Sequence, residues 1–181
     1  MRAWFAACAA ALIVCTAPGQ TNASSDWQFT LSTLTGRTVS MADYRGKWLL
    51  IYFGYTFCPD VCPATLSELG DALKALGPRA ARVHTLFVTV DPARDKPPVL
   101  ARYLKAFDPR IEGLRGDAEA TENAEKSFHV YYRPRSIGHG EYAIDHSSYI
   151  YVFDPQGHFV QLLAPDAPGH KIAEDVKRLV R

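Results

Sequence analysis

GYTFCPDVCPATL (Gly54–Leu66) decides the fold expected for this chain. It continues an almost wholly apolar run, KWLLIYFGY (Lys47–Tyr55), which is typical of a central strand covered on both faces. Pro63 suits a first helical position, and the leucines that follow recur at helical spacing until a Gly-Pro pair ends the pattern. A CxxxC pair, Cys58 and Cys62, therefore lies between a buried strand and the start of a helix.

The rest of the chain predicts further strands and helices around this unit. The expected strands lie at residues 27–39 (a hairpin), 82–90, 147–153 and 158–163. The expected helices begin at Pro97, at an Asp117 cap and at Pro168. Residues 131–144 form an extended excursion. The fold class expected is α/β, a mixed β-sheet flanked by helices, with an N-terminal hairpin and the inserted excursion before the last strands.

The first 23 residues are typical of a secretory signal peptide, with a basic start at Arg2, an apolar run over residues 3–17 and a polar end at Ala23. We therefore expect a signal peptide over residues 1–23 and one domain over residues 24–181, in an exported, periplasmic protein. Anchoring to the inner membrane by the uncleaved segment is the alternative, although the apolar run is shorter than the roughly 20 residues of a spanning helix.

Removal of this segment changes the cysteine and charge counts. Of four cysteines only Cys58 and Cys62 remain. Loss of Arg2 lowers the number of basic residues from 20 to 19, which equals the 19 acidic residues. A net charge of zero gives no electrostatic reason to expect a nucleic-acid partner, and none is predicted. In an oxidising compartment an exposed dithiol becomes a disulfide unless something reduces or ligates it.

Three interpretations of the cysteine pair stay open at this point. Cys62 lies near a helix N-terminus, where unpaired N–H groups and the helix dipole favour a thiolate, as in a redox pair. A structural disulfide would close so short a loop that it removes little chain entropy. A structural zinc site needs four protein ligands, and two cysteines with one histidine leave a position open.

If the two cysteines bind a metal ion together with a histidine, that histidine is one of the six in the sequence. His146, in EYAIDHSSYIYVFDP, immediately precedes a buried strand whose start faces the dithiol in a thioredoxin-like sheet. Asp145-His146 takes the place of the cis-proline that is usual there. Packed, helix-end or exposed-loop positions suit the other five, which are His84, His129, His139, His158 and His170.

Over nearly all of the mature domain the chain resembles the Sco (SenC) copper chaperones, which are involved in assembling cytochrome c oxidase. The similar segments are GYTFCPDVCPATL, VTVDPARDKP, RIEGLRG, FHVYYRP and YAIDHSSYIYVFDPQGHF. The CxxxC pair followed by Asp-His is the specific part of the resemblance. It implies a thioredoxin-like, copper-binding domain with the metal held by Cys58, Cys62 and His146. Two thiolates and an imidazole suit Cu(I), with Cu(II) in some redox states.

The function implied is that of a periplasmic copper metallochaperone that delivers copper to the dinuclear copper site of cytochrome c oxidase. Its expected partners are the copper-site subunit of the oxidase, other periplasmic copper chaperones and thiol reductants. The alternative is an enzyme, a thiol–disulfide oxidoreductase that maintains reduced cysteines in the copper-receiving subunit, with Cys58 and Cys62 as its redox dithiol.

Several residues near the expected site have supporting or purely structural roles in this interpretation. Asp145 either orients His146 or forms a turn. The acidic pair Asp91 and Asp95 is explained as loop and helix-cap residues. Tyr55 or Phe57 shields the site from water.

Overall fold

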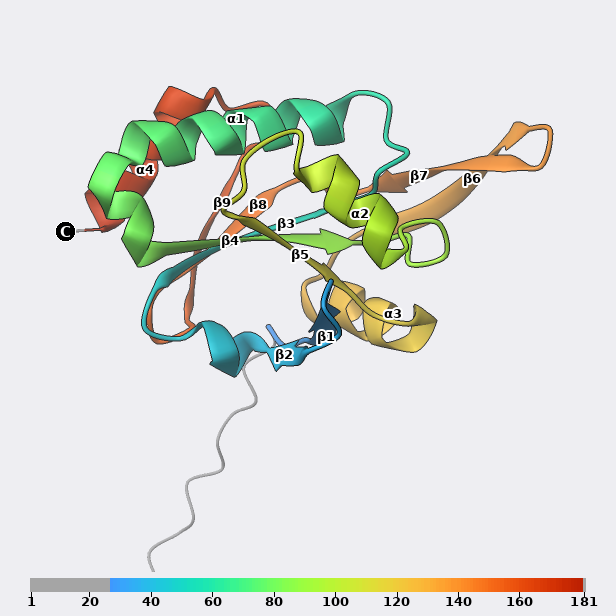
Figure 1. Cartoon of the computed structure of the whole chain (residues 1–181), viewed down its shortest axis with the longest axis horizontal. Coiled ribbons are helices and arrows are strands. Elements are labelled where there is room, and N and C mark those ends of the chain that lie inside the picture. The colour runs from blue at the N-terminus through green and yellow to red at the C-terminus, as the bar shows by residue number, and fades with distance from the viewer. Residues whose placement is uncertain (1–26, 181) are drawn as a thin grey trace, which may run out of the picture.

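A seven-stranded sheet with helices on both faces forms the body of the protein, in a computed structural model that describes residues 27–180 (Figure 1). Its strand order is β2-β1-β5-β4-β3-β8-β9. These strands are β1 (Thr30–Thr33), β2 (Thr38–Ser40), β3 (Trp48–Gly54), β4 (Val83–Thr89), β5 (Ile111–Arg115), β8 (Ile150–Phe153) and β9 (Phe159–Leu163). The helices are α1 (Val61–Leu76), α2 (Pro97–Leu104), α3 (Ala118–Ser127) and α4 (Gly169–Leu179), with 3-10 turns η1 (Met41–Tyr44) and η2 (Gly77–Arg82).

The sheet is mixed, as expected. Strand β3 runs parallel to β4 and antiparallel to β8, while β4 and β5 are parallel to each other. Helices α1 and α4 pack side by side on one face, and α3 lies on the opposite face (Figure 1). Because both faces of β3 are covered, its residues from Leu49 to Gly54 are all buried, which explains the apolar run in the sequence. The predicted α/β fold class is confirmed.

Aromatic side chains fill the core on the α3 side of the sheet. The ring of Phe128, which follows α3, lies 5.2 Å from that of Phe53 and 5.7 Å from that of Tyr151. Both phenylalanines are fully buried. Each such side chain stabilises the fold by about 1.5–3 kcal/mol relative to exposure. This packing fixes the strand that leads into the cysteine loop.

The predicted N-terminal hairpin is confirmed. Strands β1 and β2 pair antiparallel with Leu31 opposite Val39, and both side chains are buried. Ser40 then begins η1 through a capping box, in which its backbone N–H donates to the Asp43 carboxylate at 2.8 Å.

Strand β5 was not predicted from the sequence. It is short and contains Gly113, and an interior glycine weakens the signal of a strand. A Cβ at this position would lie 2.7 Å from Leu104 Cδ1, so the close approach of α2 requires the glycine. Gly113 therefore weakens the sequence signal of β5 and at the same time allows β5 to pack against α2.

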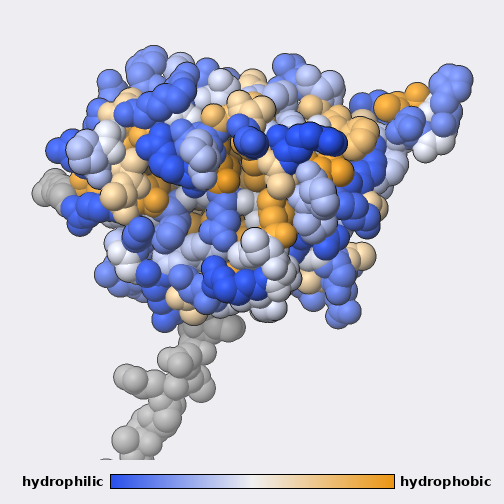
Figure 2. Space-filling model, viewed as in Figure 1, coloured by the Kyte–Doolittle hydropathy of each residue, from blue (hydrophilic) through white to orange (hydrophobic). Residues whose placement is uncertain are grey.

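The excursion before the last strands is an antiparallel hairpin, with β6 (Tyr132–Gly138) paired to β7 (Glu141–His146). Figure 2 shows this hairpin standing clear of the rest of the surface. All seven residues of β6 are exposed. The hairpin returns to the body of the protein at its last residue, His146.

One boundary differs from the sequence prediction, and one prediction falls on residues that the structure does not describe. Helix α1 begins at Val61, so that Pro63 is its third residue and Cys62 stands within the first turn. The signal peptide predicted over residues 1–23 lies outside the described residues. Between residues 27 and 180, no helix combines the length and the apolar character needed to cross a membrane.

Candidate metal centre

Cys58, Cys62 and His146 meet at one edge of the sheet. Cys58 lies on the loop after β3, Cys62 in the first turn of α1, and His146 at the end of β7. The Sγ atom of Cys62 is 3.6 Å from Nε2 of His146, and the backbone N–H of Cys62 donates to Sγ of Cys58 at 3.4 Å. The two sulfurs and an imidazole nitrogen all lie within 4.8 Å of one another. The three residues singled out in the sequence are thus brought together.

The cysteine sulfurs are largely withdrawn from water. Cys62 is fully buried and Cys58 is 9% exposed, while His146 is half-buried. A Cβ added at Gly54 would lie 3.1 Å from Cys62 Sγ and 2.9 Å from Phe87 Cε2. The sulfur therefore packs directly against the backbone at the end of β3, in space that only a glycine leaves free.

The imidazole of His146 has a fixed orientation. Its Nδ1 lies 2.8 Å from the carbonyl oxygen of Ser147, which can only accept, so Nδ1 carries the proton. The lone pair of Nε2 then faces the cysteine sulfurs, as metal ligation requires. The Tyr55 ring stands edge-on to the imidazole at 5.7 Å and is buried. Of Tyr55 and Phe57, the two residues expected to shield the site from water, Tyr55 is thus the one that does so.

Asp145 does not orient His146, contrary to one of its two sequence interpretations. Its carboxylate points to solvent and lies 3.6 Å from Nε of Arg135 on the neighbouring strand. Adjacent residues of a strand point to opposite faces, so a neighbour of His146 within β7 faces away from the imidazole. The orienting group is the backbone carbonyl of Ser147, which sequence reasoning missed because any residue would supply it.

The two thiols differ strongly in acidity. A hydrogen bond from the Cys62 thiol lowers the pKa of Cys58 to about 4, against the opposing effect of burial. The same hydrogen bond, together with burial, raises the pKa of Cys62. In the reduced protein at neutral pH, Cys58 is therefore a thiolate and Cys62 keeps the shared proton.

Asp95 holds the loop that leads to Cys58. It is fully buried and accepts hydrogen bonds from the Thr56 hydroxyl at 2.6 Å, the Thr56 N–H at 3.1 Å and the Thr89 hydroxyl at 2.6 Å. The expected helix-cap role is wrong, because Lys96 is the N-cap of α2. Burial raises the pKa of the Asp95 carboxyl. The strand end and the cysteine loop are thus tied to one carboxylate.

Arg94 ties the hairpin to the same region. Its guanidinium lies 3.7 Å from the ring centre of Tyr142, a residue of β7, and donates to the Tyr142 carbonyl oxygen at 2.8 Å. It also lies 4.6 Å from the ring of Phe57, which is 57% exposed and therefore does not shield the site. Asp91, the other acidic residue of the DPARD sequence, is buried and pairs with Arg94.

Within residues 27–180, Cys58, Cys62 and His146 form the one cluster of histidine, cysteine or acidic residues with spacing suited to a metal ion. The remaining five histidines lie elsewhere. His84, for example, is half-buried in β4 and stands edge-on to Tyr44 at 5.4 Å, a packing role. The geometry therefore singles out the same histidine as the sequence does.

Comparison with known families gives a match over most of the chain. The SCO1/SenC family model matches residues 17–181. This chain belongs to the SCO1/SenC family. The resemblance inferred from the sequence motifs is therefore confirmed.

Curated SCO1/SenC relatives come from bacteria and mitochondria. The chain is 37% identical over 158 residues to protein SenC of Rhodobacter capsulatus, a match that covers 87% of this chain and 72% of SenC. It is 39% identical over 154 residues to the mitochondrial SCO2 homolog of Bos taurus, covering 83% of this chain and 58% of that protein. The chain thus spans little more than half of the mitochondrial relative.

Solved SCO1/SenC structures share the fold. The copper-bound structure of ScoI from Bradyrhizobium japonicum has a TM-score of 0.78 at 39% identity, over 83% of this chain and 96% of that one. Copper-bound yeast Sco1 has a TM-score of 0.77 at 36% identity, over 83% of this chain and 85% of that one. A third neighbour, BsSco, at 26% identity and a TM-score of 0.64 over 83% of this chain and 90% of that one, is described as a member of the Sco family of cytochrome c oxidase assembly proteins.

Proposed function

We propose that this protein binds copper through Sγ of Cys58, Sγ of Cys62 and Nε2 of His146. The observation that carries the proposal is the meeting of these three atoms within 4.8 Å, with the Nε2 lone pair turned toward the sulfurs. Two soft sulfur ligands and one imidazole form a donor set suited to Cu(I). The copper-bound structures of two relatives support the choice of metal.

We further propose that copper is a cargo, delivered to the dinuclear copper site of cytochrome c oxidase. A site with three protein ligands leaves room for a ligand of the recipient to enter before the donor ligands leave. The description of BsSco as an oxidase assembly protein supports the oxidase as destination. The recipient is then the copper-site subunit, and the features of residues 1–23 support export to the periplasm as the place of delivery.

Redox state gates this function. Copper binding needs both thiols reduced, since a disulfide has no thiolate to offer. The low pKa of Cys58 supplies one thiolate at neutral pH without metal, whereas Cys62 has to release its proton when copper binds. A thiol reductant is therefore a second partner of the protein.

Transfer itself tests the proposal. Copper-loaded protein is mixed with the metal-free, reduced copper-site domain of the oxidase, and the copper content of both is measured after separation. We expect copper to move to the recipient from the wild-type protein. Copper that stays on the donor at every ratio, while the recipient takes up copper from a small-molecule complex, would contradict delivery.

A thiol–disulfide oxidoreductase is the second candidate, favoured by the acidity of Cys58 beside a helix N-terminus. In this reaction the Cys58 thiolate attacks a target disulfide, and the released target sulfur takes a proton. The Cys62 thiol then loses its proton and attacks the Cys58 sulfur of the mixed disulfide, which breaks the bond from Cys58 to the target. The second target sulfur leaves and takes up a proton, so that a Cys58–Cys62 disulfide and a reduced target result. The variant Cys62→Ser should trap the mixed disulfide through Cys58. Absence of any such adduct with the oxidised recipient domain would exclude this reaction.

A further inference from the structure

Exposed apolar side chains gather around the metal centre. Residues 27–180 expose eight large apolar side chains, and four of them belong to the segments that carry the metal ligands. We call these four the aromatic rim: Phe57, Tyr131, Tyr132 and Tyr149. Apolar side chains exposed singly need no explanation, whereas a group of them on one surface is typical of a place where another molecule binds.

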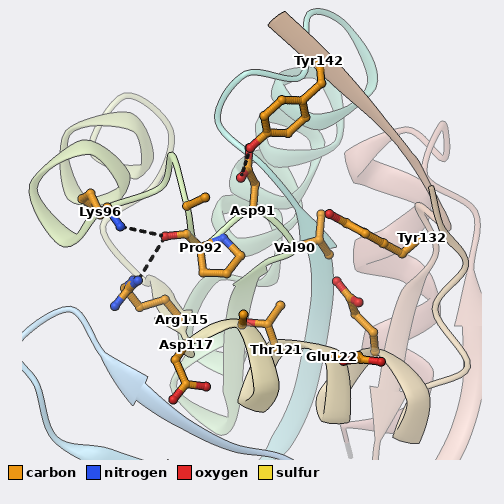
Figure 3. A pocket seen from close by; sticks show the side chains of 13 residues that line it. Val90, Asp91, Pro92, Lys96, Arg115, Asp117, Thr121, Glu122, Tyr132 and Tyr142 are labelled. Carbon is orange, nitrogen blue, oxygen red and sulfur yellow. Dashed lines mark hydrogen bonds between the residues drawn. The ribbon is translucent and has the colours of Figure 1, made fainter. Parts of the chain in front are cut away.

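Tyr132 lies beside the histidine ligand. It is the cross-strand neighbour of His146 in the β6–β7 hairpin, so the two side chains leave the hairpin on the same face. Figure 3 shows the Tyr132 ring projecting from the hairpin toward a pocket that Tyr142 also lines. Because Tyr132 is 40% exposed, a molecule that approaches the imidazole of His146 from this face also contacts the phenol ring.

Phe57 stands on the cysteine side of the centre. It directly precedes the first cysteine ligand, and its side chain is the most exposed of the eight. The Arg94 guanidinium lies 4.6 Å from the ring centre of Phe57 and 5.7 Å from that of Tyr55. The Tyr55 ring in turn contacts the imidazole of His146. These contacts connect Phe57 to the histidine ligand, so both belong to one region of the surface.

Tyr131 and Tyr149 continue the aromatic rim past the end of β7. The backbone N–H of Tyr131 donates to the Ser147 hydroxyl at 2.9 Å, and its carbonyl oxygen accepts from the Ser147 N–H at 3.0 Å. Tyr131 is therefore held opposite the residue that follows His146, and Tyr149 comes two residues later. Tyr131 and Tyr132 are neighbours in an extended chain and point to opposite faces, so aromatic rings border the end of β7 on both sides.

The aromatic rim has little net charge around it. The segments that carry it, residues 55–60 and 131–149, contain two arginines and three acidic residues. One arginine and one acidic residue, Arg135 and Asp145, lie 3.6 Å apart and offset each other. A surface of this kind offers no field of one sign to attract a charged partner. Burial of apolar surface is then the main source of binding free energy.

We propose that the aromatic rim is the docking surface for the copper-receiving protein, which presents an apolar surface around its own copper ligands. This inference rests on the proposed function and adds to it the kind of surface that the recipient presents. Copper has to leave from Cys58, Cys62 and His146, and the half-buried imidazole is the most accessible of the three ligands. The recipient therefore approaches at His146, between Tyr131 and Tyr132. Tyrosine side chains are frequent hot spots in such interfaces.

Copper-transfer kinetics of the full chain test the docking surface. Copper-loaded protein is mixed with increasing concentrations of the metal-free, reduced copper-site domain of the oxidase, and copper uptake is followed after rapid separation. Phe57→Ser and Tyr132→Ser should each raise the recipient concentration that gives half-maximal rate by about tenfold. Their Cu(I) affinity, from titration against a chelator, should stay within about twofold of wild type, which also shows that they fold. Leu162→Ser, at an exposed leucine of β9, is the control and should change neither quantity.

Salt separates this surface from one that attracts its partner by charge. Between about 0.05 and 0.5 M salt, the half-saturating recipient concentration of the wild type should change by less than about threefold. A salt effect above about tenfold would overturn the uncharged docking surface in favour of charged contacts. Wild-type half-saturation in both variants would overturn the docking surface and leave copper delivery standing. Absence of transfer from the wild type would contradict delivery itself, and the docking surface would fall with it.

Discussion

The backbone N–H of Ile144 donates a hydrogen bond to the phenol oxygen of Tyr55 at 3.2 Å. Tyr55 precedes Cys58 by three residues, and Ile144 precedes His146 by two on β7. This one bond therefore joins the loop that carries a cysteine to the strand that carries the histidine, although 89 residues separate the pair.

Tyr55→Phe removes the acceptor and leaves the Ile144 N–H buried without a partner. We expect a loss of about 1–3 kcal/mol in the free energy of unfolding, measured by urea titration, with a smaller effect on copper affinity than loss of a ligand. Tyr149→Phe, at an exposed tyrosine, is the matched control and should be neutral. Equal stability of Tyr55→Phe and the wild type would show that the bond does not fasten the strand.

Asp95→Ala should loosen the cysteine loop. It deprives the Thr56 and Thr89 hydroxyls and the Thr56 N–H of their acceptor, so we expect a loss of about 2–4 kcal/mol and faster hydrogen exchange at Thr56. Asp166→Ala, at an exposed aspartate, serves as the control and should change neither quantity. Unchanged exchange at Thr56 in Asp95→Ala would contradict the positioning role.

Gly54→Ala should disturb the site without touching a ligand. The new methyl group would lie 2.9 Å from the Phe87 ring and 3.1 Å from Cys62 Sγ, so the sulfur or the ring has to move. We expect a loss of about 1–3 kcal/mol in stability together with weaker copper binding. Gly70→Ala on α1 places its Cβ at an ordinary contact distance of 3.4 Å and is the control. Wild-type copper affinity in Gly54→Ala would show that the sulfur position is not constrained there.

The reduced, metal-free protein should contain one thiolate in mild acid. Absorbance at 240 nm should rise with a midpoint near the Cys58 pKa of about 4, and Cys58→Ser should abolish that rise. The folded state then binds fewer protons than the unfolded state from about pH 4 up to the ordinary thiol pKa of about 8.5. Cys58 therefore makes stability rise with pH across this interval and fall as pH drops through 4. A midpoint near 8.5 would contradict the assignment.

The sequence predicts those parts of the site that depend on local pattern. Cys58 and Cys62 follow an apolar strand and begin a helix, and His146 follows from the order of strands in the inferred fold. Asp145 shows the limit of the same reasoning, because β7 continues through His146 and alternation turns the two neighbours apart. Had residue 145 stood in a loop, its side chain could have pointed to the same side as that of His146.

Tertiary contacts account for what sequence reasoning missed. Asp95 lies 39 residues from Thr56 in the chain, and no local pattern connects them. The pairing of Arg94 with Tyr142 spans 48 residues and depends on a hairpin whose strands are mostly exposed. Strand β5 was missed because it contains Gly113, and glycine is rare in strands. The glycine is there because Leu104 packs too close to leave room for a side chain.

An anaerobic Cu(I) titration of the reduced full chain against a competing chelator tests the central claim most directly. Cys58→Ser, Cys62→Ser and His146→Ala are measured in parallel, with His170→Ala at an exposed histidine as the control. We predict one tightly bound equivalent, weakened about a hundredfold or more by each of the three substitutions and unchanged in the control. Wild-type affinity in His146→Ala would contradict the three-ligand copper site.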